Sequence, residues 1–94
     1  LRPRSPAAEH AAGMAALRAC LPPGAVLDRS RADHAIAVRL LRRGASAPFV
    51  AAVLRAGEKA AGRGGERAAG DYVARTVDAA LRSAAGAPPA VVAR

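Results

Sequence analysis

The chain has 94 residues, which allows one small domain. Its hydrophobic fraction of 52% overstates the core, because 28 residues are alanine and only 20 are Leu, Ile, Val, Phe, Met or Tyr. The net charge of +8 favours a polyanionic partner, and nucleic-acid binding is the first functional interpretation. A GC-rich genome also produces alanine and arginine in excess, so base composition stays open as a second explanation.

Several classes of site and location are excluded. One cysteine (Cys20) and two histidines (His10, His34) are too few for a zinc site. No nucleophile–base pair, paired carboxylates or Gly-Lys-Ser/Thr phosphate loop is present, so we predict no catalytic residue, no metal ligand and no cofactor in this segment. No apolar run is long enough to span a bilayer and no signal peptide is visible, so we expect no membrane partner and a cytoplasmic location.

The first predicted helix covers residues 6–20. Residues 1–5 read as a linker, and Ser5 followed by Pro6 is typical of an N-cap and first helical position. Met14, Leu17 and Leu21 give this helix a thin apolar face. The Pro22–Gly24 turn ends it, and we expect the apolar connector 25–27 to reach into the core.

The second predicted helix covers residues 30–43. Ser30 and Asp33 have the spacing of a capping box, which indicates a helix start at Ser30 and a capping role for Asp33. Gly44 supplies the positive φ that often follows a helix. One apolar stripe runs along this helix, made of Ala32, Ile36, Ala37, Leu40 and Leu41.

The third predicted helix covers residues 47–57, with Ser46 as its N-cap and Pro48 in its first turn. Its apolar face is Phe49, Val50, Val53 and Leu54. The short link from Gly44 makes helices two and three pack as a pair. Such a pair is either an αα-hairpin of a bundle, which the loose turn pattern favours, or a helix-turn-helix.

A glycine-rich stretch, residues 58–70, precedes the last predicted helix, residues 71–85. The stretch is either a phosphate-contacting basic loop or merely a solubilising one. Asp71 is the expected cap of the last helix, and its buried side is expected to be Val73, Val77, Ala80 and Leu81. Gly86 and Pro88–Pro89 are expected to end the helix. Together these elements predict an all-α fold, a small bundle of about four helices with a central αα-hairpin.

A family resemblance extends this interpretation over roughly residues 27–82. The matching stretches are DRSRAD (28–33), LLRRGAS (40–46), VAAVL (50–54) and DYVARTVDAA (71–80). In this order they resemble the C-terminal helical domain of RepB-like replicative DNA primases of plasmids and phage-like elements. Ser30, Ala32 and Asp33 match the start of the family's first helix, Gly44 and Ser46 its turn, and Tyr72, Arg75 and Thr76 its last helix.

The resemblance implies a division of the chain and a role for it. Residues 1–26 form an N-terminal helix and linker, 27–86 the primase-C-terminal-like domain and 87–94 a tail. The chain is expected to be a segment of a longer protein, in which an upstream catalytic domain with divalent metal ligands makes primers. This segment alone is not expected to be an enzyme, whereas the parent protein is expected to be a DNA primase.

The leading hypothesis is therefore a DNA-binding accessory domain that contacts single-stranded DNA or the DNA backbone during primer synthesis. Its predicted phosphate contacts come from arginines of the second helix, most of them near its end, from the loop and from the last helix. Tyr72 either stacks on a base or packs in the core. The predicted nucleic-acid-binding set is Arg31, Arg39, Arg42, Arg43, Lys59, Arg63, Tyr72 and Arg75. Two alternatives remain: a helical module that docks on its catalytic domain or a replication partner, and a helix-turn-helix-like DNA-binding regulator.

Overall fold

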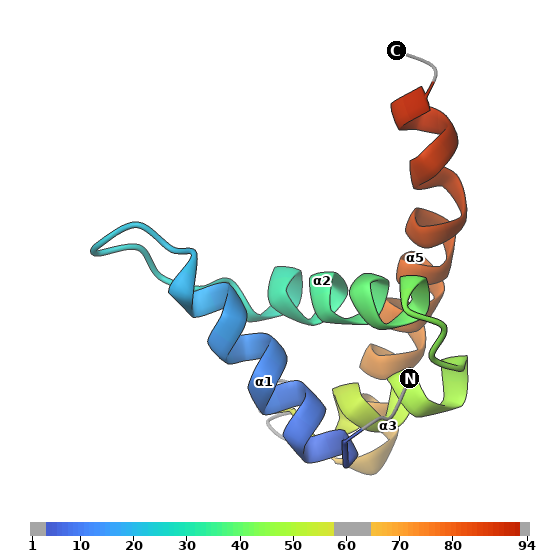
Figure 1. Cartoon of the computed structure of the whole chain (residues 1–94). Helices are drawn as coiled ribbons and strands as arrows, with labels where there is room; N and C mark the ends of the chain where they lie inside the picture. The colour runs from blue at the N-terminus through green and yellow to red at the C-terminus, as the bar shows by residue number, and fades with distance from the viewer. Residues whose placement is uncertain (1–3, 58–64, 93–94) are drawn as a thin grey trace.

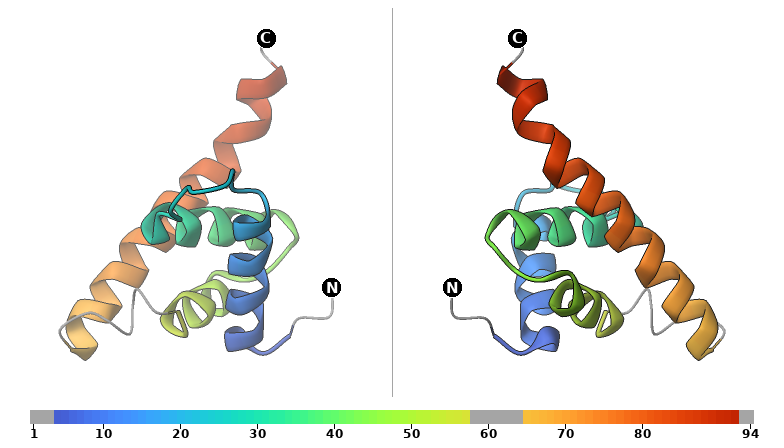
Figure 2. Two further views of the ribbon diagram at one scale, coloured as in Figure 1. Left: turned by 90° about the vertical axis from the view of Figure 1, so that its left-hand side faces the viewer. Right: turned by 90° about the vertical axis from the view of Figure 1, so that its right-hand side faces the viewer.

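The structure is a computed structural model, and it describes residues 4–57 and 65–92. These residues form four helices and no strand, which confirms the all-α prediction: α1 (Pro6–Ala19), α2 (Arg29–Arg42), α3 (Ala47–Arg55) and α5 (Glu66–Val92). Helices α2 and α5 make the most extensive contact, while α1 and α3 pack against each other and against α2 (Figure 1). The C-terminal part of α5 extends beyond the other three helices (Figure 2).

All four helices contribute to one apolar core. Its largest fully buried apolar side chains are Val50, Val53 and Leu54 of α3, and the predicted stripe of α2 faces them. The core also includes Met14 of α1, so the helix predicted as a separate N-terminal element shares its core with α2, α3 and α5. The buried apolar set is Met14, Ala32, Ile36, Ala37, Leu40, Val50, Val53, Leu54, Ala69, Tyr72, Val73, Val77 and Ala80.

The caps and the turn of the central hairpin follow the sequence closely. Ser5 and Ser46 cap α1 and α3, as predicted, by accepting the amides of Ala8 and Phe49. Gly44 has φ +96°. The amides of Gly44 and Ala45 bond to the carbonyls of Leu41 and Leu40, which is the pairing of a Schellman motif. This turn positions the last turn of α2, and with it the arginines at its end.

The start of α2 differs from the prediction. The N-cap is Asp28, whose Oδ1 accepts the amides of Ser30 at 3.0 Å and Arg31 at 3.2 Å. A carboxylate satisfies two orphan amides there and also suits the positive end of the helix dipole, so it displaces Ser30 as the cap. Asp33 consequently lies in the second turn and has no capping role.

The prediction was also wrong at both ends of α5 and in the connector. The helix begins at Glu66, so Asp71 is an exposed residue within it and not a cap. It continues to Val92 past Pro88–Pro89, although a proline inside a helix removes one backbone hydrogen bond and its ring crowds the carbonyl four residues earlier. Leu81 is 42% exposed and Val26 is 90% exposed, whereas Leu27 alone of the connector packs on the core.

Candidate functional site

The most strongly buried polar group of the described residues lies where α1, α2 and α5 meet. Asp33 is 1% exposed, and each of its carboxylate oxygens has one partner. His10 Nε2 donates to Oδ1 at 2.8 Å, and the Tyr72 hydroxyl donates to Oδ2 at 2.5 Å. We call these three residues the buried triad. It joins positions that are 23 and 39 residues apart in the chain.

Close packing fixes the geometry of the buried triad. A Cβ atom at Gly57, just after α3, would lie 2.7 Å from Cε1 of His10, so only glycine leaves room for the imidazole there. Burial raises the pKa of Tyr72 to about 12, and the hydrogen bond to Asp33 and the charge of Asp33 act in the same direction. Side-chain hydrogen bonds with Ser30 and Thr76 oppose this shift. The tyrosine is therefore held as a neutral donor to the carboxylate.

The buried triad has no access to a ligand. His10 and Tyr72 are 8% and 6% exposed, and the Tyr72 hydroxyl points at Asp33. The ring of Tyr72 belongs to the core cluster, so its prediction as a base-stacking residue is replaced by the packing alternative. A carboxylate with both oxygens satisfied ties three helices together, and the triad is a structural element of the fold.

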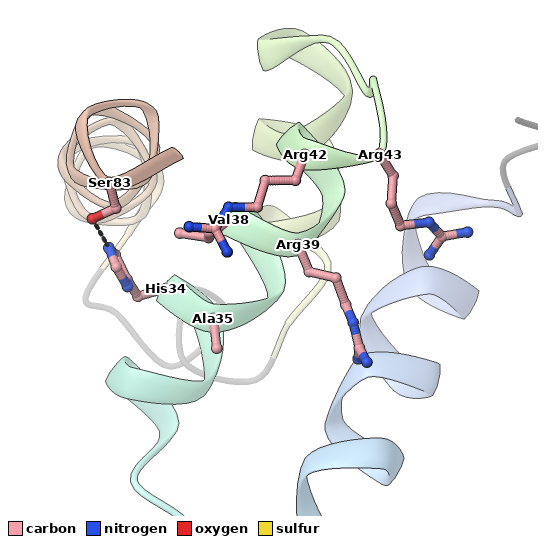
Figure 3. A pocket seen from close by; sticks show the side chains of 7 residues that line it. All are labelled: His34, Ala35, Val38, Arg39, Arg42, Arg43 and Ser83. Carbon is pink, nitrogen blue, oxygen red and sulfur yellow. Dashed lines mark hydrogen bonds between the residues drawn. The ribbon is translucent and has the colours of Figure 1, made fainter. Parts of the chain in front are cut away.

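The candidate ligand site is a groove on the opposite flank of α2, between α2 and α5. It is open to solvent and has a volume of about 640 Å³. Two rows of α2 with four-residue spacing line it, and α5 contributes Ser83 (Figure 3). We call it the arginine groove: its lining residues are His34, Ala35, Val38, Arg39, Arg42, Arg43 and Ser83.

The arginine groove has two chemically different ends. At the start of both rows lie His34 and Ala35, and Val38 follows one turn later. Arg39, Arg42 and Arg43 occupy the last turn of α2. Figure 3 shows the Arg42 side chain over Val38 and toward α5, whereas Arg39 and Arg43 extend toward α1. The groove is thus apolar and aromatic toward the start of α2 and cationic toward the end of α2.

The three guanidinium groups of the groove form no ion pair in the part of the chain that the structure describes. The nearby carboxylate of Glu9 is 6% exposed and instead faces Arg4, at 3.7 Å. Arginines without internal partners attract a phosphate or carboxylate of a ligand, which a guanidinium binds through two parallel hydrogen bonds.

The other predicted contact residues are not brought into the groove. Arg31 is exposed in the first turn of α2, where its Nε lies 3.8 Å from Oδ2 of Asp28. Arg75 is exposed on α5 and does not line the groove. Lys59 and Arg63 lie outside the described residues. Three of the eight predicted residues, Arg39, Arg42 and Arg43, therefore meet at one site.

The sequence prediction missed two polar residues of the groove. His34 and Ser83 are half-buried, and His34 Nε2 lies 3.3 Å from Oγ of Ser83 across the α2–α5 boundary. The spacing of His34, Val38 and Arg42 placed them in one row, so His34 had a sequence signal. Ser83 had none, because its place in the groove depends on how α5 packs on α2.

Two further findings concern metals and membranes. In the described part of the chain, no three His, Cys, Asp or Glu side chains converge on a position for a metal ion. None of the helices described combines the length and the hydropathy that crossing a bilayer requires.

Comparisons with known proteins add no identification. No protein-family model, no curated protein and no solved structure matches the chain.

Proposed function

We propose that this helical unit is the DNA-binding accessory domain of a RepB-like DNA primase or replication protein, where it helps to hold the template during primer synthesis. The arginine groove is the phosphate-contacting surface. Primer synthesis itself belongs to a separate catalytic domain with its divalent metal, and the complete protein acts in the cytoplasm. The resemblance of residues 27–82 supplies the biological context of this proposal.

One observation carries the choice of DNA as partner. Arg39, Arg42 and Arg43 lie in one groove without a carboxylate partner among the described residues, on a chain with a net charge of +8. Phosphate contacts release counterions. For each contact with a single strand, the logarithm of the binding constant therefore falls by about 0.7 for every tenfold rise in salt concentration. The proposal thus predicts weak binding that depends steeply on salt and little on sequence.

The test measures binding of a fluorescent oligothymidine by anisotropy over a range of salt concentrations. The double variant Arg42→Gln/Arg43→Gln removes two groove charges. We expect the logarithmic salt slope to become shallower by about 1.4, and the affinity at 0.1 M salt to fall about 25-fold.

The matched control is Arg18→Gln/Arg67→Gln. It removes the same charge from two exposed arginines outside the groove, one in the last turn of α1 and one at the start of α5. This control should keep most of the affinity. Equal losses in both double variants, or an affinity that does not change with salt, would contradict the groove as the contact surface.

The alternative of a protein-docking module makes a different prediction for the same variants. A docking partner, such as the catalytic domain, would stabilise the bundle in the absence of DNA. The groove variants would then leave DNA binding unchanged and alter the thermal stability of the co-expressed complex.

A further inference from the structure

The arginine groove contains more than a phosphate site requires. Phosphate contacts need only the cationic end, yet the groove continues for two turns of α2 to His34 and Ala35. Val38 lies between the two ends and is also packed on the core, so it forms a fixed apolar surface. A ligand that fills this groove must carry an anion at one end and a flat or apolar group at the other.

The imidazole of His34 is held in place at the apolar end. Its Nε2 is bonded to Oγ of Ser83 at 3.3 Å, so one edge of the ring is anchored on α5 (Figure 3). An anchored ring loses little conformational entropy when a ligand binds against it. His34, Val38 and Arg42 follow one another at four-residue spacing, so their Cα atoms lie about 6 Å apart along the helix axis.

We infer that His34 is a base-contacting residue: the groove binds a nucleotide unit of the strand, with its phosphate on Arg42, whose side chain turns toward α5, and its base against His34 and Val38. A nucleotide carries these two groups on opposite sides of its sugar, and the groove presents their partners one to two helical turns apart. Stacking on an aromatic ring is tolerant of base identity, so this contact adds affinity without sequence specificity. The inference rests on the proposed function and deepens it.

The experiment compares two oligonucleotides of equal length and equal phosphate number, one with bases and one built of abasic sites. If bases contribute, wild-type protein binds the normal strand about fivefold or more tightly than the abasic strand. His34→Ala should reduce this ratio toward one, while the affinity for the abasic strand changes little. Dividing the base-dependent ratio of wild-type protein by that of His34→Ala isolates the contact between His34 and the base.

A second variant separates the aromatic ring of His34 from its polar nitrogen atoms. His34→Phe retains an aromatic face and should preserve most of the base-dependent ratio, whereas an electrostatic role for His34 predicts its loss. Thermal melting of each variant shows that the bundle is folded. Equal binding of both strands by wild-type protein would overturn this inference and leave the proposed function intact. No binding of either strand would instead refute the proposed function.

Discussion

The hydroxyl of Tyr72 offers a direct test of the buried triad. Tyr72→Phe removes one oxygen and leaves Oδ2 of Asp33 buried without its donor. Losing a hydrogen bond to a charged group costs about 1.5–3 kcal/mol. For a domain of this size we expect the melting temperature at neutral pH to fall by at least about 6 °C.

The same hydroxyl makes stability depend on alkaline pH with a defined sign. The pKa of Tyr72 is about 12 in the folded chain, against about 10 when unfolded. A raised pKa means that the folded state holds this proton more tightly. Its contribution is complete below pH 10 and is lost as pH rises toward 12, by about 1.4 kcal/mol for each pH unit.

The assay uses the fact that the chain has one tyrosine. Ultraviolet absorbance of tyrosinate reports the titration of Tyr72 directly, and urea unfolding at several pH values reports stability. Tyr72→Phe retains Lys59 and every other titrating group, so the difference between the two stability curves belongs to Tyr72 alone. A titration midpoint near 10, or parallel curves for the two proteins between pH 10 and 12, would refute this account of the triad.

Two glycine substitutions test the packing around these sites. Gly57→Ala should destabilise the bundle by more than 1 kcal/mol, because its Cβ would overlap the imidazole of His10. Urea unfolding measures this, and a neutral effect would show that the ring moves without cost. Gly44→Ala should cost about 1 kcal/mol, because φ is +96° although no atom lies within 4 Å of the new Cβ. Gly44→Asn should cost less, and equal losses for Ala and Asn would contradict a purely conformational cause.

The sequence predicted local structure well where a single element determines it. The N-caps Ser5 and Ser46, the positive φ of Gly44 and the apolar stripe of α2 all depend on residues within one turn. Helix periodicity also carried the signal for burial of Asp33, which lies four residues before the buried Ala37. The capping-box spacing pointed the other way, and Asp28 proved to be the stronger cap.

The failures occurred where packing between distant segments decides the outcome. His10 and Tyr72 lie on different helices from Asp33, so no local pattern in the sequence joins the buried triad. The exposure of Leu81 depends on where α5 leaves the bundle. In the candidate site, the clustering of Arg39, Arg42 and Arg43 followed from their spacing, whereas Ser83 entered the groove only through the crossing of α5 over α2.

The buried triad also determines how much of the chain behaves as a transferable unit. The stretch that carries the family resemblance begins near residue 27, yet Asp33 within it depends on an imidazole from α1. Excision or grafting of the later helices alone would remove one of the two hydrogen-bond donors of Asp33 and uncover the side of the core on which Met14 packs. The folding unit within the described residues thus includes α1, and a boundary drawn at residue 27 would cut through it.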